Sequence, residues 1–295
     1  MKEEAATIIG AGPAGIAAAI QLARSGIDPL VVEKERVGGL LKNAHWVENY
    51  PGFPDGIAGL DLVSRFERQL ASHVPEVLFE EVTNVGLDGH AFCVATEAKR
   101  WRARIVIVAS GTKPRKDSDV AVCPGAEERI FYEIYPLHAV VGKRIAIVGA
   151  GDAAYDYALN LGKRNDILIL SRSATARCLP LLRERAARAP RITVRDESRV
   201  RRVAAGSEGL DIGSACRGEE RFDHADFLVF AIGREPQSDF LSETVRQQQA
   251  ELERSGRLFH IGDVHNGLFR QTAIAVGDGI KAAMRIITHQ EGNDR

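Results

Sequence analysis

The stretch "ATIIGAGPAGIAAAIQLARSGIDPLVVE", residues 6–33, decides the fold of this chain. It begins as a short apolar strand, turns through GAGPAG, continues as an alanine-rich helix and closes with a second apolar strand, PLVVE. In such a turn Gly10 permits the tight bend, Gly12 lets the backbone approach a pyrophosphate, and Gly15 allows the helix to pack closely on the strand. Glycines cluster in turns for many reasons, but this order of elements predicts a dinucleotide-binding βαβ unit.

The end of the second strand indicates which kind of nucleotide this unit binds. Glu33 is the last residue of PLVVE, where a carboxylate can accept hydrogen bonds from both hydroxyls of a ribose. The amino terminus of the helix offers its N–H groups and the positive end of its dipole to the phosphates. The first site is therefore predicted to hold a nucleotide whose ribose hydroxyls are free.

The same pattern returns in the middle of the chain, at residues 144–171, "RIAIVGAGDAAYDYALNLGKRNDILILS". Gly149, Gly151 and Ala154 take the places of the three glycines of the first copy. A strand, a glycine-rich turn, a helix and a further strand follow one another as before. Two such units in one chain predict two nucleotide-binding domains.

The second unit lacks an acidic residue at the end of its second strand. Arg172 and Arg177 of "SRSATAR" stand there instead. A 2′-phosphate needs cationic donors at this position, and a carboxylate would repel it. The pattern therefore favours NADPH over NADH. The alternative is that both arginines are solvated surface residues of an arginine-rich chain.

The remaining segments indicate how the two units are connected. Residues 77–109 are predicted to be strands separated by turns, forming a small antiparallel insertion that returns to a buried strand. After "DFLVFAIGREP" the tail carries no third dinucleotide signature, so we expect it to fold back and complete the first domain. The predicted fold is α/β, with two Rossmann-like (three-layer ββα) nucleotide-binding domains, the second inserted into the first. Residues 1–114 and 240–295 would form the first domain, and residues 115–239 the inserted one.

Composition and charge narrow the classes of partner. The chain has 295 residues, 45% of them hydrophobic and 27% charged, and a net charge of −1. This balance is ordinary for a globular protein and gives no global attraction to nucleic acid or to an anionic membrane. The apolar N-terminus is interrupted by GAGPAG, which argues against a signal peptide. The four cysteines and eight histidines show no metal-ligand spacing, so no metal site is expected, and a reducing cytoplasm is the expected location.

The motifs taken together resemble one family. In order along the chain they are "GAGPAG", "VVEKERVGGLL", "VENYPGFP", "VASGTKPR", "GAGDAA", "SRSATAR", "AIGREP", "IGDV" and "RQTAIAVGDGIKAA". This order is similar to that of the thioredoxin-reductase-like flavoproteins and covers nearly the whole chain. The resemblance implies that the first domain holds FAD, that the inserted domain holds NADPH, and that the protein is a homodimer.

The resemblance also implies which residues touch the cofactors. Gly39, Leu40 and Asn49 would lie along the flavin and its ribityl chain, and Asp263 would bind the ribityl or phosphate region. Val82, on the adjoining strand, would contact adenine through its backbone. The expected FAD contacts are Gly10, Gly12, Pro13, Ala14, Gly15, Glu33, Lys34, Gly39, Leu40, Asn49, Val82, Gly111, Asp263, Gln271, Thr272 and Ala273. The expected NADP contacts are Gly149, Gly151, Asp152, Ala153, Ala154, Arg172, Arg177 and Gly233.

A helix that opens at residues 271–273 has a special role in this resemblance. Its N-terminal amides would face the pyrimidine edge of the flavin. There the helix dipole would stabilise the negative charge that develops when the flavin is reduced.

The chain departs from thioredoxin reductases where their CxxC dithiol stands. Counting back from the second glycine turn, the two cysteine positions fall on Tyr132 and Tyr135 of "YEIY". Tyrosine cannot exchange a disulfide. The run at residues 130–159 resembles the thioredoxin-reductase-type ferredoxin/flavodoxin–NADP reductases, which lack the dithiol. Members of that branch place an aromatic ring on the flavin from a C-terminal segment, whereas no aromatic residue follows Phe269 here.

The predicted function is therefore an FAD-dependent NAD(P)H oxidoreductase that passes electrons to a redox protein, such as a ferredoxin or flavodoxin, or to a small acceptor, without an active-site dithiol. One alternative is a regulatory protein that binds flavin and nucleotide without turnover. Another is a thioredoxin or disulfide reductase that uses a non-standard cysteine such as Cys178. Eight arginines within residues 183–202 could dock an acidic electron carrier, or could simply be a solvated face.

Overall fold

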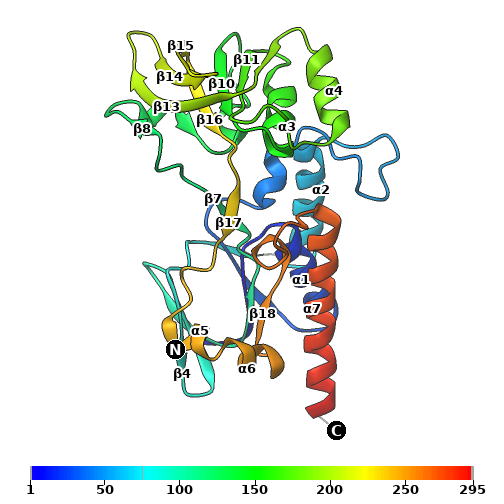
Figure 1. Ribbon diagram of the computed structural model, residues 1–295. Helices are drawn as coiled ribbons and strands as arrows, with labels where there is room; N and C mark the ends of the chain where they lie inside the picture. Colours follow the sequence, from blue (N-terminus) through cyan, green and yellow to red (C-terminus); the bar gives the residue numbers. More distant parts are fainter. Residues whose placement is uncertain (1, 75, 294–295) are drawn as a thin grey trace. The chain divides into compact units, whose positions relative to one another are not determined.

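The computed structural model describes residues 2–74 and 76–293 (Figure 1). The chain forms two compact units, each described here by itself. Unit 1 comprises Met1–Lys42, Val47–Lys113 and Glu235–Arg295, and unit 2 comprises Asn43–Trp46 and Pro114–Arg234. The inserted unit thus ends five residues earlier than the sequence analysis placed it, and Asn43–Trp46, expected in the first domain, groups with unit 2. Which cofactor each domain holds stays a prediction.

Unit 1 is built around a seven-stranded sheet with the order β3-β2-β1-β6-β5-β4, in which β18 also pairs with β6. The pairs β1–β2, β1–β6, β2–β3 and β6–β18 are parallel, whereas β4–β5 and β5–β6 are antiparallel. The strands are β1 (Glu3–Ile9), β2 (Pro29–Glu33), β3 (Val77–Phe79), β4 (Asn84–Asp88), β5 (Ala91–Ala95), β6 (Arg100–Val108) and β18 (Leu258–His260). The tail therefore returns to the first unit, as expected, because β18 joins β6.

Helices complete unit 1, and two of them pack very closely. Gly279 of α7 lies so near α1 that a Cβ there would stand 2.2 Å from the carbonyl oxygen of Ala14. Small residues on both helices allow this approach, and together with β1 they enclose one of the two cores of the unit. The second core lies between the parallel strands and the antiparallel β4–β6 segment. The helices are α1 (Pro13–Arg24), η1 (Gly39–Asn43), α2 (Gly59–Ala71), α5 (Glu243–Gln247), α6 (Gln249–Arg254), η4 (Gly262–Val264) and α7 (Thr272–Asn293).

Unit 2 repeats this arrangement on a smaller scale. A parallel sheet, β12-β11-β10-β16-β9, and a second sheet, β15-β14-β13-β8, enclose one core, and the helices cover another. The parallel sheet consists of β9 (Ile130–Phe131), β10 (Arg144–Val148), β11 (Asp166–Leu170), β12 (Ile192–Arg195) and β16 (Phe227–Phe230). The second sheet consists of β8 (Ala121–Val122), β13 (Ser198–Ala205), β14 (Leu210–Cys216) and β15 (Glu219–Ala225). The helices are η2 (Glu127–Arg129), η3 (Tyr135–Leu137), α3 (Asp152–Leu161) and α4 (Pro180–Arg188).

The chain passes between the units through two short strands, β7 (Thr112–Pro114) and β17 (Arg234–Pro236), which pair with each other. Each unit carries a parallel sheet, helices and further strands in the α/β arrangement predicted from the two glycine signatures. Within the described residues, none of the helices has the length and apolarity that crossing a bilayer requires.

Candidate cofactor sites

The turn after β1 requires glycine at two positions. Gly10 has a φ of +106°, and a Cβ on it would lie 2.4 Å from the carbonyl oxygen of Ala109. A Cβ on Gly15 would lie 1.9 Å from the carbonyl oxygen of Gly10. Both distances are shorter than any non-bonded contact, so only glycine fits at these two positions. The absence of a side chain is in turn what allows the helix to pack this closely on the strand.

Gly12 is constrained in a different way. It caps α1 with an ordinary extended backbone (φ −77°), and the nearest protein atom to a Cβ there would be the Cα of Gly39, at 3.9 Å. Gly39 itself has a φ of +54° and faces Gly12. Two glycine backbones thus pass each other at the amino terminus of α1 with no side chain between them. This is the arrangement that a pyrophosphate needs for contact with backbone N–H groups.

Glu33 holds its carboxylate beside this turn. The side chain is 9% exposed; its Oε2 accepts a hydrogen bond from the Ala11 N–H (2.8 Å), and its Oε1 accepts one from the Glu35 N–H (3.1 Å). The acid is therefore fixed at the carboxyl end of β2, where a ribose would lie. Lys34, the next residue, is exposed. Pro13 and Ala14 form the first turn of α1.

Residues far apart in the sequence meet at the start of α7. Asn49 Nδ2 donates to Gln271 Oε1 at 2.7 Å, and the Gln271 carbonyl accepts from the Ala275 N–H at 3.0 Å. Gln271 thus precedes the helix, and Thr272 and Ala273 open it, so the helix predicted at this point is present. The first-turn N–H groups of a helix have no intrahelical partner and can face an anion.

The IGDV loop is fixed by a residue that sequence reasoning missed. Asp278 Oδ2 accepts from the Gly262 N–H (3.2 Å) and from Asn266 Nδ2 (2.5 Å), which holds η4 and with it Asp263. Gly262 has a φ of +71°, and a Cβ there would lie 2.8 Å from the Cβ of Ala14. The only signal in the sequence was the pair of glycines that flanks Asp278.

Three further expected FAD contacts are Val82, Leu40 and Gly111, and for Val82 the expected secondary structure is wrong. Val82 does not lie on a strand, as was expected, but in the connection between β3 and β4, where it is buried. The connection is irregular because β3 ends at Phe79 and β4 starts only at Asn84. Leu40 lies in η1, and Gly111 has a φ of +66° with its carbonyl accepting from the Gln237 N–H at 3.1 Å.

In unit 2, a glycine-rich turn with similar constraints lies at the carboxyl end of β10, before α3. Gly149 has a φ of +141°, and a Cβ on it would stand 2.3 Å from the Ala231 carbonyl oxygen. Gly151 caps α3, and a Cβ there would meet no protein atom within 4 Å. Ala154 is fully buried where the first copy has its third glycine, while Ala153 is exposed in the first turn.

The segment that carries the predicted phosphate-binding arginines returns to this turn. The Arg177 N–H donates to the Ala150 carbonyl at 2.8 Å, and Arg177 pairs with Gly151 as an isolated bridge. Asp152 Oδ1 accepts from the Leu179 N–H at 2.7 Å and so anchors the same segment. Arg172 follows β11, and both arginine side chains are exposed. Gly233 (φ +111°) accepts a hydrogen bond from the Arg115 N–H at 3.0 Å.

The two tyrosines at the expected dithiol positions are packed against other rings in unit 2. The Tyr132 ring stacks on Phe230 with a centroid separation of 5.8 Å, and Tyr135 packs edge-on against His138 at 5.5 Å. Burial raises the pKa of the Tyr132 hydroxyl. Between them, Glu133 forms an ion pair with Arg234 at 3.2 Å.

The four cysteines are all free. They lie on β5, after β8, before α4 and at the end of β14. Burial, the largest contribution, raises the pKa of the Cys178 thiol, and the carboxylate of Asp152 raises it further. A raised pKa lowers the fraction of thiolate, the nucleophilic form. Cys178 is therefore a poor candidate for disulfide exchange.

Asp156, on α3, is a buried carboxyl whose ionisation works against folding. It accepts a hydrogen bond from the His45 N–H at 2.9 Å, but burial raises its pKa from 3.8 to about 6, with a smaller contribution from Asp152. Because the folded state binds this proton more tightly than the unfolded chain, the associated stability is present below pH 4 and is lost as the pH rises through about 6.

Asp156→Asn is therefore expected to stabilise the protein at pH 7 to 8 by up to about 3 kcal/mol. The amide oxygen can still accept from the His45 N–H, and the gain should shrink toward pH 4. Urea unfolding at several pH values measures this. Asp55→Asn, at an exposed loop position, is the control and should show no pH-dependent gain. An equal effect of Asp156→Asn at pH 4 and pH 8 would contradict the assignment.

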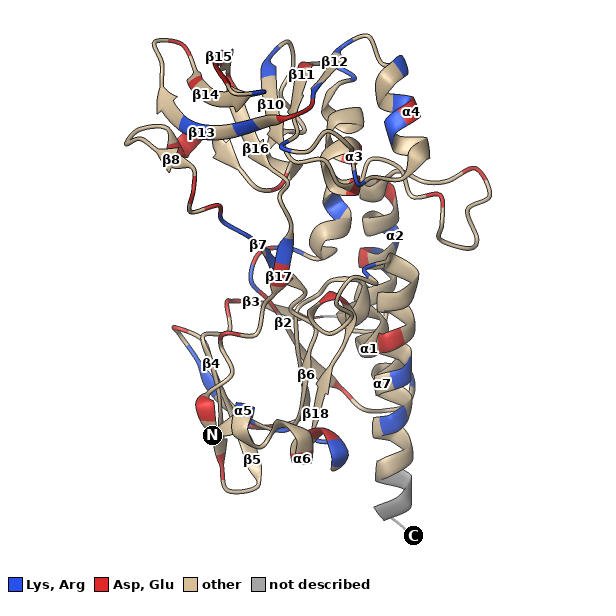
Figure 2. Ribbon diagram, viewed as in Figure 1, with Lys and Arg blue, Asp and Glu red and all other residues tan. Residues whose placement is uncertain are grey.

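At least four of the eight arginines at residues 183–202 form ion pairs with carboxylates, so the segment is partly neutralised. In Figure 2, α4 carries an acidic segment among its basic ones, whereas β13 itself carries only basic ones. The ion pairs are Arg188–Glu184 (2.5 Å), Arg191–Asp166 (3.1 Å), Arg195–Asp223 (2.6 Å) and Arg199–Asp119 (2.5 Å). Arg202 Nε lies 3.3 Å from the sulfur of Cys123. The segment therefore agrees with the solvated-face interpretation better than with a basic docking patch.

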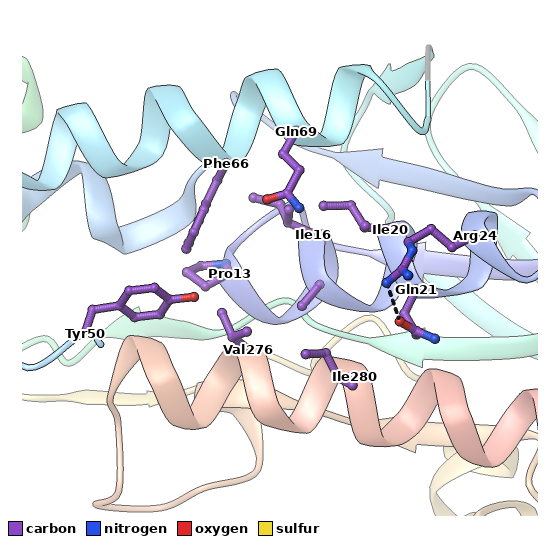
Figure 3. A pocket seen from close by; sticks show the side chains of 11 residues that line it. Pro13, Ile16, Ile20, Gln21, Arg24, Tyr50, Phe66, Gln69, Val276 and Ile280 are labelled. Carbon is purple, nitrogen blue, oxygen red and sulfur yellow. Dashed lines mark hydrogen bonds between the residues drawn. The ribbon is translucent and has the colours of Figure 1, made fainter. Parts of the chain in front are cut away.

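An apolar groove of about 250 Å³ lies on unit 1 among α1, α2 and α7 (Figure 3). Ile16 and Ile20 of α1 form its floor, Phe66 of α2 lies on one side, and Val276 and Ile280 of α7 lie on the other. Ile280 is 39% exposed, and further exposed apolar side chains on α2 and α7 are Leu60 (41%), Ile274 (39%) and Met284 (56%).

Comparison with known proteins agrees with this geometry. Residues 5–279 match the model of the family described as pyridine nucleotide-disulphide oxidoreductase. The chain is 32% identical to NADPH-dependent thioredoxin reductase 3 of Arabidopsis thaliana over 95% of its own length, and it spans 57% of that relative. It is 30% identical to the thioredoxin reductase of Streptomyces clavuligerus, covering 94% of this chain and 91% of the relative.

Solved structures show the same fold. The thioredoxin reductase of Lactococcus lactis superposes with a TM-score of 0.84 at 26% identity, covering 97% of this chain and 98% of that one. A bacillithiol disulfide reductase of Staphylococcus aureus shares the fold with a TM-score of 0.77 at 20% identity, covering all of both chains. With both glycine turns in place, the chain belongs to the pyridine nucleotide-disulphide oxidoreductase family, as a thioredoxin-reductase-like flavoprotein oxidoreductase that uses FAD and NAD(P)H.

Proposed function

We propose that this protein transfers electrons from NADPH through FAD to an acceptor without an active-site dithiol. Unit 1 would hold FAD at Gly10, Gly12 and Glu33, and unit 2 would hold NADPH at Gly149 and Gly151. The observation that carries the proposal is the occupation of both expected dithiol positions by tyrosines, in a chain whose four cysteines are all free.

The chain's own residues would bind and orient the cofactors. When bound, FAD accepts a hydride from the reduced nicotinamide and passes the electrons on, and no side-chain acid or base is strictly required for this. The amino terminus of α7 would orient its dipole toward the flavin and stabilise negative charge on it. Arg172 and Arg177 would bind the 2′-phosphate and so select NADPH over NADH.

The test is spectroscopic. Purified protein should be yellow, and anaerobic NADPH should bleach the flavin absorbance at a rate at least as high as turnover. Reoxidation should then be followed with ferredoxin, flavodoxin, a quinone and a disulfide in separate experiments. A colourless protein that does not take up FAD would refute the proposal, and binding without reduction would favour a regulatory protein.

Replacing all four cysteines by serine is expected to leave NADPH-dependent flavin reduction and reoxidation within about twofold of the unchanged protein. The reason is that the proposed electron path contains no sulfur, and a hydroxyl in place of a thiol changes side-chain volume little. Stopped-flow rates of both half-reactions measure this. Loss of reoxidation alone would show that a cysteine carries electrons, as in a disulfide reductase with a non-standard cysteine.

The proposed acceptor is a redox protein or a small molecule met in the cytoplasm. The ion pairs in residues 183–202 make steering of an acidic carrier by that segment weak. We therefore place docking specificity elsewhere on the molecule. Neither nucleic acid nor a membrane is proposed as a partner, since the net charge is −1.

We further propose that the protein is a homodimer that covers the apolar groove of unit 1. Ile280→Glu is expected to shift it toward monomers, because each copy would bury an uncompensated carboxylate at the interface. Sedimentation velocity at micromolar concentration measures the change. Glu243→Gln, on α5, is the control. A protein that is monomeric before any substitution would contradict this part of the proposal alone.

A further inference from the structure

Asn43 forms three hydrogen bonds with the segment Tyr132–Tyr135 of unit 2, called here the tyrosine segment. Its Oδ1 accepts from the N–H groups of Ile134 (3.1 Å) and Tyr135 (2.9 Å), and its Nδ2 donates to Glu133 Oε2 at 3.3 Å. Asn43 is 2% exposed and Ile134 is fully buried. The Asn43 side chain therefore holds three consecutive residues. They are Glu133 and Ile134, which lie between the two tyrosines, and Tyr135, which is the second tyrosine.

The second carboxylate oxygen of Glu133 forms a further interaction that holds the same segment. Glu133 Oε1 accepts from Arg234 at 3.2 Å, while Oε2 accepts from Asn43. The side chains of this ion pair are only 17% and 28% exposed, so solvent screens the pair less than a surface one. The segment Tyr132–Tyr135 is thus held at both backbone and side chain, and it continues directly into the buried η3 turn at Leu137.

We propose that Asn43 is the positioning residue of the Tyr132–Tyr135 segment and supplies, through hydrogen bonds, the constraint that a disulfide between these two positions would supply covalently. A disulfide would restrict the separation of the two Cα atoms to a narrow range. Without one, a four-residue segment of this kind gains conformational freedom unless other bonds restrict it. The inference rests on the proposed dithiol-free function for its catalytic consequence only.

The catalytic consequence follows from what Asn43 holds within unit 2. A segment that is fastened by Asn43 keeps the rings of Tyr132 and Tyr135 in a fixed place within that unit for an incoming acceptor. Loss of Asn43 should therefore slow electron transfer to the acceptor, through a higher KM, more than it slows flavin reduction by NADPH.

Asn165 offers a matched control within unit 2. It is 1% exposed, accepts from the Lys143 N–H at 3.0 Å, and donates to the carbonyls of Val140 and Leu161 at 3.0 Å each. Asn43→Ala and Asn165→Ala thus remove the same side chain from positions that are both almost fully buried and both hydrogen-bonded to the backbone of unit 2. Only Asn43→Ala releases the tyrosine segment.

The experiment measures amide hydrogen exchange and both half-reactions in the FAD-loaded full-length protein. In Asn43→Ala, exchange at Ile134 and Tyr135 should rise at least tenfold and the acceptor KM should rise about tenfold, with flavin reduction within about twofold. In Asn165→Ala, exchange should rise at Lys143, with both half-reactions unchanged. Unchanged exchange at Ile134 and Tyr135, or an equal acceptor KM in the two variants, would overturn the inference.

Exchanging the amide and the carboxylate between positions 43 and 133 should restore the hydrogen bond and with it the acceptor KM. N43D keeps the oxygen that accepts from the two backbone N–H groups but places a carboxylate against Glu133. In the double variant N43D/E133Q the new amide can donate to the new carboxylate, so the acceptor KM should return to within about threefold of the unchanged protein. A double variant worse than both single variants would overturn the inference. If the unchanged protein shows no flavin reduction, the proposed function fails, while the exchange measurement still tests the positioning role.

Discussion

Gly12→Ala is expected to give a folded protein that binds FAD at least about 100-fold more weakly and purifies nearly colourless. The added Cβ fits the protein, since its nearest neighbour would be the Gly39 Cα at 3.9 Å and the backbone of Gly12 (φ −77°) is ordinary for alanine. It would instead occupy the space through which a pyrophosphate reaches the α1 N–H groups. Overpacking costs about 1–3 kcal/mol, and lost charge-assisted hydrogen bonds add to it.

The measurement is flavin absorbance per protein after purification, followed by titration of the apoprotein with FAD. Gly86→Ala in β4 is the matched control, because its Cβ would make only ordinary contacts, at 3.6 Å from Asn84 Nδ2. It should keep FAD and a normal unfolding midpoint. A Gly12→Ala protein with full flavin content would place the cofactor elsewhere on unit 1.

Arg172→Ala/Arg177→Ala is expected to raise the KM for NADPH roughly 100-fold and leave that for NADH within about twofold. Each guanidinium would lose a charge-assisted hydrogen bond to the 2′-phosphate, and about 3 kcal/mol in total corresponds to this factor. Both side chains are exposed, and the Arg177 backbone pairs with Gly151, so removal should not disturb the turn.

Steady-state kinetics with both nucleotides measures the change in preference. Arg201→Ala is the control, since Arg201 is an exposed arginine on β13 of the same unit. It should leave both KM values unaltered. If the double variant weakens NADH as much as NADPH, the arginines serve the pyrophosphate or the fold, and the 2′-phosphate assignment is wrong.

The sequence by itself determined the two glycine turns and the fold built on them. Gly10, Gly15 and Gly149 need backbone space or a positive φ that no other residue type tolerates, so the letters carry the geometry directly. The return of the tail to unit 1 followed from the lack of a third signature. The glycine turns are local features of the sequence, and the return of the tail follows from counting those turns.

Only the tertiary structure decided which distant residues meet. Asn43 with Ile134, Asn49 with Gln271 and the ion pairs of residues 183–202 join positions that lie far apart along the chain or on different strands. Val82 was expected on a strand but lies between β3 and β4, because a connection carries no periodic pattern from which to place it. A side chain's partners depend on where the folded backbone brings other groups, and a linear pattern does not contain that information.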